Sequence, residues 1–350
     1  MIESSVLSLV GDTPLVRLNR LADGLRATIA LKLEMINPGG SIKDRIGIRM
    51  IEEAEKSGEL RPGGTIVEPT SGNTGVGLAM TAAVKGYHCI FVLPDKVSEE
   101  KIALLRAYGA EVVVTPSGVP HDSPESYYGV AKRLARTIPG AYLPFQYFNP
   151  TNPQSHYEST GPEIWRESEG RVTHLVAGIG TGGTISGTAR YLKERNPGIR
   201  VVGADPSGSI YSDPLNRHPY RVEGIGKDFY PGTYDPSVID EVIQVEDVDS
   251  FQTARRLARE EGILAGGSAG TAVWAALQLA AREDRSDALI VVILPDSGRG
   301  YLSKIFNDEW MQANGYLSEP VPAGRGSRWG DLLRQEELTF EAVLASLNDD

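Results

Sequence analysis

Short apolar runs rich in β-branched residues alternate along the chain with longer segments of helical periodicity. This alternation is typical of α/β proteins with parallel sheets. Several of the short runs are apolar throughout, as strands covered on both faces are. The pattern predicts strands at residues 65–67, 89–93, 111–114, 175–177, 200–203, 242–245 and 289–294.

Capping residues in the sequence indicate where the predicted helices begin and end. The segment after Ser41 carries apolar residues at helical spacing and stops at Gly58, so a hydroxyl cap and a glycine bracket one helix. Similar patterns predict helices at 98–108, 184–195, 250–261 and 270–282. Residues 318–330 read as a Pro- and Gly-rich linker, and 331–350 as a short C-terminal segment.

Composition and charge narrow the class of protein. The 350 residues are 41% hydrophobic and 23% charged, which is ordinary globular usage. With 35 basic against 46 acidic residues, the net charge is −11, the wrong sign for binding a phosphate backbone, so we expect no nucleic-acid partner. We expect no membrane partner either, since neither a long apolar stretch nor a basic amphipathic one is present.

The single cysteine and the N-terminal residues indicate in which cellular compartment the protein is located. Cys89 lies in an apolar run, so we expect its side chain to be buried in the core without a chemical role. Because it is the single cysteine, no intrachain disulfide can form. Residues 1–5 lack the basic and apolar regions of a signal peptide. We therefore expect a cytoplasmic protein.

A glycine-rich loop follows the predicted strand at 175–177 and opens a helix. Gly178, Gly180 and Gly183 satisfy G-x-G-x-x-G, and Asp205 follows at the spacing of a dinucleotide fingerprint. The residues from Thr181 onward suit a single phosphate monoester equally well. The loop predicts a phosphate site and leaves the nucleotide question open.

Three further loops suit small polar ligands. Residues 69–75 follow a predicted strand and present hydroxyls and N–H groups that fit a small carboxylate. Residues 266–270 again join an apolar segment to a helix. The fourth loop, 37–45, places Lys43 near a helix start. Together these loops suit a phosphorylated aldehyde cofactor bound as a Schiff base.

The four loops, in this order and with 11–15 in front, resemble those of fold-type II pyridoxal-phosphate enzymes. The resemblance covers residues 5–317 and lies in the cysteine synthase and cystathionine β-synthase family. Residues 94–98, 222–229 and 294–297 are similar to the cystathionine β-synthase branch.

The resemblance implies a role for each matching residue. It makes Lys43 the Schiff-base and catalytic lysine, Asn73 the partner of the cofactor's phenolic oxygen, and Ser268 the contact of the pyridine nitrogen. The phosphate would be held by Gly180, Thr181, Gly182, Gly183 and Thr184. The substrate would contact Thr70, Ser71, Gly72, Thr74, Gln146 and Gly224.

The reaction implied is β-replacement, which condenses L-serine with L-homocysteine to L-cystathionine and water through an aminoacrylate, as in transsulfuration and cysteine biosynthesis. Lys43 would act as base and then acid at Cα, which desolvation of its amine assists. A hydroxyl at Ser268 cannot keep the ring nitrogen protonated, which favours prompt loss of a β-leaving group. The five histidines show no ligand spacing, so we expect no metal and give them structural or surface roles.

Some features depart from the family pattern. Lys227 stands where the eukaryotic synthases usually have an aromatic residue, which leaves the contact with homocysteine open. A heme-binding extension is absent, so we expect no heme. Residues 329–333 resemble the entry to paired regulatory domains, yet the chain stops at Asp350. A homodimer is expected from the resemblance alone.

The fold implied is α/β, similar to the tryptophan synthase β-subunit, with two domains of mostly parallel twisted sheets flanked by helices and the cofactor in the cleft between them. The larger domain would comprise residues 1–40 and 146–317, and the smaller one 41–145. Three alternatives remain. They are a cysteine synthase using O-acetylserine or O-phosphoserine with sulfide, an NAD-dependent dehydrogenase, and an inactive protein that binds the cofactor.

Overall fold

The computed structural model describes residues 2–70, 72–95, 97–120 and 122–317. The chain divides into two compact units, Met1–Tyr301 and Leu302–Asp350. The second unit contains α10 (Asp308–Ala313), where Asn307 Oδ1 accepts the backbone N–H of Trp310 at 2.9 Å. The predicted linker at 318–330 and the segment at 331–350 lie outside the described residues. Every helix in the described ranges is too short or too polar to cross a bilayer.

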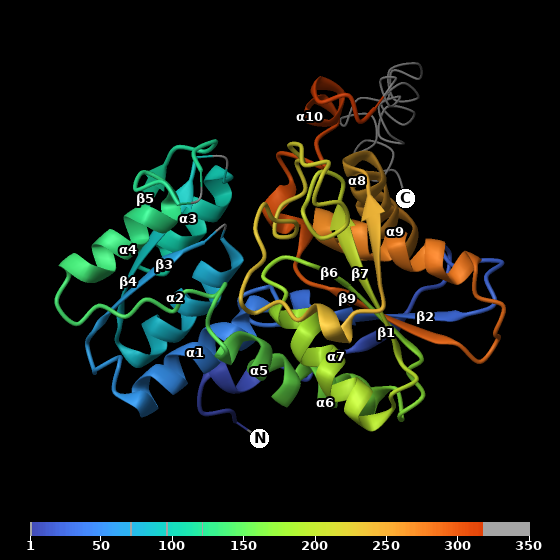
Figure 1. Ribbon diagram of the computed structural model, residues 1–350, viewed down its shortest axis with the longest axis horizontal. Coiled ribbons are helices and arrows are strands. Elements are labelled where there is room, and N and C mark those ends of the chain that lie inside the picture. The colour runs from blue at the N-terminus through green and yellow to red at the C-terminus, as the bar shows by residue number, and fades with distance from the viewer. Residues whose placement is uncertain (1, 71, 96, 121, 318–350) are drawn as a thin grey trace, which may run out of the picture. The chain divides into compact units, whose positions relative to one another are not determined.

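The described part of the first unit contains two β-sheets (Figure 1). The six-stranded sheet has the order β1-β2-β9-β6-β7-β8 and is parallel except for the β1–β2 pair. The three-stranded sheet has the order β3-β4-β5 and is parallel. The strands are β1 (Leu15–Arg17), β2 (Thr28–Leu33), β3 (Thr65–Pro69), β4 (His88–Pro94), β5 (Glu111–Thr115), β6 (His174–Gly178), β7 (Arg200–Pro206), β8 (Glu241–Val245) and β9 (Leu289–Leu294).

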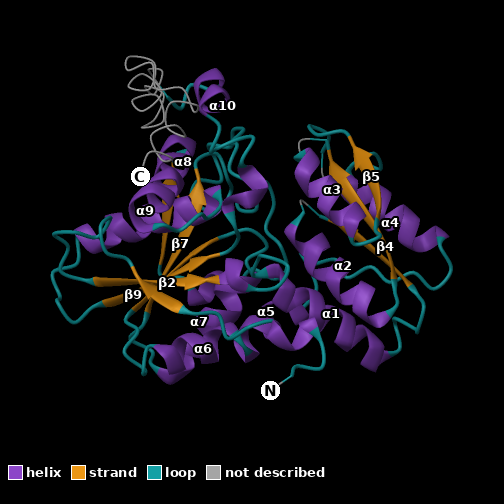
Figure 2. Ribbon diagram, turned by 180° about the vertical axis from the view of Figure 1, so that it is seen from behind, coloured by secondary structure: helices purple, strands orange, loops and turns teal. Residues whose placement is uncertain are grey.

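Helices flank both sheets (Figure 2), which confirms the predicted α/β class. They are α1 (Lys43–Ser57), α2 (Asn73–Lys85), α3 (Glu99–Ala107), α4 (Tyr127–Thr137), α5 (Thr151–Glu158), α6 (Thr160–Glu167), α7 (Gly183–Arg195), α8 (Asp247–Arg256) and α9 (Gly267–Ala281). The helix predicted at 250–261 ends early, because the chain changes from α8 to a π-helical turn over Leu257–Glu261. The three-stranded sheet lies within residues 41–145, but the division into two domains stays a prediction.

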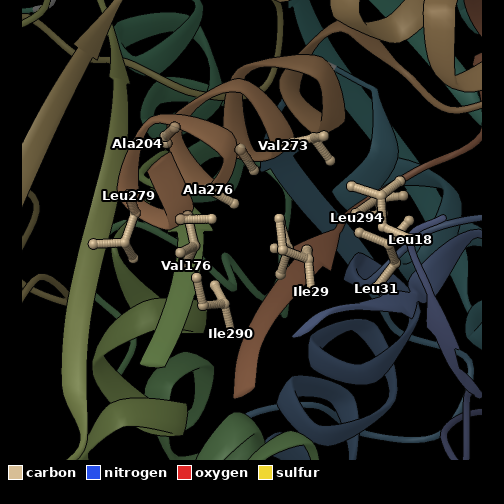
Figure 3. Close-up of a cluster of buried hydrophobic side chains, with 14 of the residues drawn as sticks. Leu18, Ile29, Leu31, Val176, Ala204, Val273, Ala276, Leu279, Ile290 and Leu294 are labelled. Carbon is tan, nitrogen blue, oxygen red and sulfur yellow. The ribbon is translucent and has the colours of Figure 1, made fainter. Parts of the chain in front are cut away.

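The core explains why the β9 run is apolar throughout. Its even-numbered residues, such as Ile290 and Leu294, pack beneath α9 together with Ile29 of β2 (Figure 3). Its odd-numbered residues Val291 and Ile293 belong to the cluster on the other face of the sheet. Since side chains alternate along a strand, a strand covered on both faces needs an apolar residue at every position.

Two of the loops predicted to bind ligands follow strands, one in each sheet. β3 leads into the loop before α2, and β6 leads into the loop before α7. β9 leads into Pro295 and Asp296, which were not predicted to bind a ligand. In open α/β sheets, ligands bind outside the carboxyl ends of the strands. The fold therefore directs attention to these three strand ends and to the start of α1.

Candidate active site

Lys43 is the first residue of α1, and its side chain is half-buried. The Ser41 hydroxyl accepts the backbone N–H of Lys43 at 3.2 Å, and the Ile42 N–H donates to the carbonyl of Pro295 at 2.8 Å. Ser41 also forms a β-bridge with Asp296. These contacts fix the start of α1 against the segment that follows β9.

The environment of the Lys43 amine favours its neutral form. Burial lowers the pKa of Lys43 to about 8, although the negative charges of Asp296 and Glu34 oppose the shift. The positive charge of Lys227 adds to the lowering. An amine with this pKa is partly neutral near pH 8, so Lys43 can accept a proton or act as a nucleophile.

The loop before Lys43 is held from both sides. Asn37 Oδ1 accepts the Gly11 N–H at 2.8 Å, and Asn37 Nδ2 donates to Glu34 Oε2 at 2.9 Å. The Gly39 N–H donates to Asp44 Oδ2 at 2.6 Å. Asp44 is buried, which raises its pKa to about 7. The loop therefore has a defined conformation, and Lys43 a defined place.

A buried ion cluster, Lys32, Glu34, Arg45, Glu163 and Glu167, lies beside this loop. Arg45 Nε pairs with Glu34 Oε2 at 2.7 Å, and Arg45 Nη1 with Glu163 Oε1 at 2.6 Å. Lys32 Nζ pairs with Glu163 at 2.9 Å and with Glu167 at 2.8 Å. The cluster ties α1 to β2 and α6, so it anchors the helix that begins with Lys43.

Asn73 begins α2 and faces Asp296, a residue that the sequence analysis did not place in the site. Asn73 Nδ2 donates to Asp296 Oδ2 at 2.8 Å, and the Tyr301 hydroxyl donates to the same oxygen at 2.6 Å. Asp296 is buried, which raises its pKa, and its Oδ1 has no hydrogen-bond partner among the described residues. The Asn73 amide also hydrogen-bonds with the Tyr301 hydroxyl, so Asn73, Asp296 and Tyr301 hold one another in place.

The predicted substrate loop meets Gln146. Thr70 Oγ1 accepts the Gly72 N–H at 3.0 Å, and Thr74 Oγ1 donates to Gln146 Oε1 at 2.7 Å. Thr70, Thr74 and Gln146 are buried. Ser71 lies outside the described residues. The structure thus brings four members of the predicted substrate set together, namely Thr70, Gly72, Thr74 and Gln146.

Glu68 holds the segment that carries Gln146, and the sequence analysis missed it. Its two carboxylate oxygens accept the backbone N–H groups of Phe145 at 2.6 Å and Gln146 at 3.0 Å. Phe145 has a φ of 51°, a left-handed conformation that L-residues adopt at a cost. Burial of Glu68 in β3 raises its pKa to about 8. Glu68 therefore stabilises an unfavourable turn beside the site.

The predicted phosphate loop opens α7. Gly182 has a φ of 82°, and α7 begins at Gly183. A Cβ at Gly183 would overlap the side-chain amide of Asn152, so this position has room only for glycine. N–H groups in the first turn of a helix have no partner within the helix and form a site for anions.

Hydroxyl groups hold the carbonyl groups of this loop. The Tyr211 hydroxyl donates to the Gly180 carbonyl at 2.8 Å, and Thr233 Oγ1 donates to the Thr181 carbonyl at 2.7 Å. Asn152 Nδ2 donates to Thr181 Oγ1 at 3.0 Å and to the carbonyl of Gln146 at 2.9 Å. Asn152 therefore connects the phosphate loop to the segment that contacts the substrate loop.

Ser268 and Gly224 lie beside the same set of residues. Ser268 is buried in the first turn of α9, and the N–H of the preceding Gly266 donates to the Asp296 carbonyl at 3.1 Å. A Cβ at Gly266 would overlap the Asp296 carboxylate, so the two segments approach closely. The segment that contains Gly224 reaches the phosphate loop through the Gly226 N–H, which donates to the Ile179 carbonyl at 2.7 Å.

His156 adds a contact that the expected structural or surface role of the histidines does not describe. It is buried, and its Nε2 lies 3.2 Å from Thr184 Oγ1, while its Nδ1 lies 2.9 Å from Thr160 Oγ1. Burial and the positive charges of Lys43 and Arg45 hold the pKa of His156 well below its usual value. A neutral His156 therefore orients a hydroxyl of the phosphate loop.

We expect His156→Asn to weaken the pH dependence of stability in acid. His156 is neutral in the folded protein, whereas the unfolded chain protonates it below about pH 6.5. Its contribution to stability is therefore present above this pH and lost as the pH falls. The free energy of unfolding of the variant, measured in urea at pH 5, 6 and 7, should change less steeply than that of the wild type, by up to about 1.4 kcal/mol per pH unit. Equal slopes would contradict the assignment.

Asp205, the acidic residue of the dinucleotide interpretation, faces its own loop instead. Its Oδ2 accepts the Ser212 N–H at 2.9 Å, and the residue is buried at the end of β7. Burial raises its pKa to about 6, although hydrogen bonds from Ser209 and Ser212 oppose the shift. Asp205 therefore has a structural role in holding the loop after β7.

Comparison with known proteins decides between the enzyme classes that the sequence left open. The family model described as pyridoxal-phosphate dependent enzyme matches residues 6–296. The chain belongs to this family. This pyridoxal-phosphate dependent enzyme has a fold-type II scaffold, and the NAD-dependent alternative is wrong.

Several relatives of this pyridoxal-phosphate dependent enzyme are cystathionine β-synthases. The rat protein is 49% identical over 349 residues, and the honey bee (Apis mellifera) protein is 47% identical over 342 residues. These matches cover 98% and 96% of this chain. They cover 62% of the rat protein and 68% of the bee protein, so the chain spans less than two thirds of the rat relative.

Solved structures of the same fold include an O-acetylserine dependent cystathionine β-synthase from Helicobacter pylori. It is 41% identical with a TM-score of 0.82, and the match covers 87% of this chain and 98% of that one. A K43A mutant of O-ureido-L-serine synthase, solved with O-ureido-L-serine bound, is 37% identical with a TM-score of 0.83 and is matched over 93% of this chain and 98% of its own.

The residues present fit pyridoxal phosphate. Lys43 supplies an amine of lowered pKa at the start of α1, and the first turn of α7 supplies N–H groups and hydroxyls for a phosphate. Asn73 supplies a side-chain amide at the start of α2, and Ser268 is a neutral residue in the first turn of α9. The family, the fold and the donor groups thus agree on the cofactor.

Proposed function

We propose that this pyridoxal-phosphate dependent enzyme condenses L-serine with L-homocysteine to L-cystathionine and water. The observation that carries the proposal is the Lys43 amine, whose pKa is lowered to about 8 at the start of α1. The names of the relatives at 47% to 49% identity support the reaction class. The cofactor, when bound, supplies an electron sink for the Cα of the amino acid.

Each group of site residues has a part in this mechanism. Gly180, Thr181 and Gly182 of the loop before α7, with Gly183 and Thr184 of its first turn, would hold the phosphate, and Lys43 Nζ would be the attachment point. The Asn73 amide, oriented by Asp296, would bind the phenolic oxygen. Ser268 would meet the pyridine nitrogen, and its hydroxyl would not hold a proton there, which would favour loss of a β-substituent over transamination.

Lys43 moves the proton. Its neutral Nζ takes the proton from Cα of serine and passes it to the β-hydroxyl, which leaves as water. The thiol sulfur of homocysteine bonds to the β-carbon as its S–H proton moves to Nζ, and Nζ then delivers that proton to Cα as cystathionine is released. Thr70, Ser71, Gly72, Thr74 and Gln146 hold the carboxylate of serine, with Gly224 beside them, and so aim its Cα–H bond at Nζ.

A second candidate has a specific basis. The O-acetylserine dependent enzyme of Helicobacter pylori indicates that acetate can replace water as the leaving group on this fold. The test is product identification by mass spectrometry after incubation with serine plus homocysteine, and separately with O-acetylserine plus sulfide or homocysteine. We expect cystathionine from serine. Product from O-acetylserine and sulfide alone would instead establish a cysteine synthase.

We also propose a homodimer and a cytoplasmic location. The support is the resemblance to the family for the dimer, and for the compartment the burial of the single cysteine, whose thiol pKa burial raises to about 12. Sedimentation of the purified protein at several concentrations tests the dimer. Fractionation of expressing cells tests the compartment.

A further inference from the structure

Lys227 lies in a cluster of aromatic side chains. We call this the aromatic cluster, and its members are Tyr127, Tyr128, Phe145, Tyr147, Phe148 and Phe229. The Lys227 ammonium lies 4.3 Å from the centre of the Tyr147 ring and 5.9 Å from that of Phe229. The rings of Tyr128 and Tyr147 meet edge to face, with centres 5.3 Å apart. Aromatic faces attract a cation but do not neutralise it.

The Lys227 ammonium has neutral partners. It donates to the Tyr147 hydroxyl at 3.0 Å and approaches the Tyr128 hydroxyl at 3.4 Å. An ammonium group has three N–H bonds, so one donor remains for another acceptor. Among the described residues no acidic side chain forms a salt bridge with Lys227, whereas the nearby Lys101 pairs with Glu223 at 2.7 Å.

Lys227 is close to the reaction site. Tyr147, its hydrogen-bond partner, directly follows Gln146, which contacts Thr74 of the substrate loop. The backbone just before Lys227 hydrogen-bonds to Ile179, next to the phosphate loop. The charge of Lys227 also lowers the pKa of the Lys43 amine. A half-buried cation, with no carboxylate partner in the described part of the chain, therefore lies next to segments that contact the substrate loop and the phosphate loop.

The pKa of the neighbouring Tyr147 hydroxyl also reflects the positive charge of Lys227. Burial alone would raise the pKa of Tyr147. The charge of Lys227 and the hydrogen bonds from Lys227, Tyr128 and Tyr127 outweigh burial, so the net direction is downward. An environment that favours a phenolate also favours a bound anion.

We propose that Lys227, assisted by the hydroxyl of Tyr147, binds the α-carboxylate of the second substrate, the amino acid that carries the thiol. The proposal rests on the proposed function. The carboxylate of the first substrate is assigned to the loop at 70–74, so a second carboxylate needs a separate donor. Sulfide has no carboxylate, so this site favours an amino-acid thiol over sulfide as the nucleophile.

The test compares two Michaelis constants in one variant. Lys227→Met keeps the length of the side chain and removes the charge. We expect the KM for L-homocysteine to rise about 10- to 100-fold, the value of one charge-assisted hydrogen bond, while the KM for L-serine stays within about 2-fold. With 3-aminopropane-1-thiol, which lacks the carboxylate, the variant and the wild type should have similar values of kcat/KM.

Two further variants serve as controls. Lys227→Arg keeps the charge and should restore most of the affinity for homocysteine. Lys132→Met removes an exposed lysine stacked 5.0 Å from Phe145 in the same aromatic cluster, and both KM values should stay at the wild-type level. If Lys227→Met lowers the unfolding midpoint, Lys227→Gln repeats the comparison with the hydrogen bonds to the phenols kept.

Several outcomes would overturn the inference. They are an unchanged KM for homocysteine, an equal rise in both KM values, and an equal loss of efficiency with the thiol that lacks a carboxylate. In each case cystathionine synthesis by the wild type still supports the proposed function. Absence of any product from the wild type with serine and homocysteine would instead overturn the proposed function, and the inference with it.

Discussion

Replacing Lys43 by alanine is expected to abolish covalent attachment of the cofactor and to reduce the rate by on the order of 10³-fold. No other residue is assigned both to hold the cofactor and to move the proton at Cα. The Lys43 amine is suited to both because burial lowers its pKa to about 8 at the first position of α1. Borohydride reduction followed by mass spectrometry of the intact protein should show the added cofactor mass in the wild type and not in the variant.

The matched control is Lys56→Ala, which removes an exposed lysine near the other end of the same helix. Its reduced form should carry the cofactor mass, and its rate should equal that of the wild type. A cofactor mass that persists on Lys43→Ala would assign the attachment to another lysine. Peptide mapping of the reduced wild type identifies the modified residue directly.

Replacing Arg45 by methionine is expected to lower the free energy of unfolding by about 3–5 kcal/mol. The loss follows from the carboxylates that the arginine neutralises, because Glu34 is fully buried and Glu163 nearly so. Burial would raise the pKa of Glu163, but hydrogen bonds and charges from Arg45 and Lys32 hold it at about 2. Without Arg45, the Glu34 carboxylate lies in the interior without its main partner.

Unfolding in urea, followed by circular dichroism, measures this loss. Arg256→Met is the control, because Arg256 pairs with Glu260 at 2.6 Å at the surface of the protein. Exposed pairs of this kind contribute little, so the control should lose less than about 1 kcal/mol. A similar small loss for Arg45→Met would show that the buried ion cluster relaxes or admits water.

The sequence predicted most strands because each is locally apolar. All the predicted runs form strands, and β9 has the predicted bounds. The segment at 28–33 was missed because Lys32 interrupts its apolar pattern. In the structure Lys32 is fully buried, and its charge is balanced by Glu163 and Glu167 of α6, far along the chain. A local pattern does not show such a partner.

The residues of the candidate site also fall into two groups, those that local sequence motifs predict and those that they do not. Lys43, Asn73 and the glycine-rich loop were found because they stand in short motifs at helix starts. Asp296, Glu68 and His156 were missed as members of the site, because each acts on a residue that only tertiary contacts bring near. Their partners, Asn73, Gln146 and Thr184, are more than 25 residues away in sequence. These three roles depend on burial and hydrogen bonding in the folded protein, so short sequence motifs do not predict them.

The pairing of β2 with β9 also sets an order of events during synthesis of the chain. β2 is translated early and lies between β1 and β9, and its parallel register with β9 runs from Thr28 against Leu289 to Leu33 against Leu294. Until the ribosome has released β9, one edge of β2 lacks its partner, and the apolar residues of β2 lack the helix and strands that cover them. Such edges promote aggregation of nascent chains, so the time between synthesis of β2 and pairing with β9 is when this sheet is exposed to that risk.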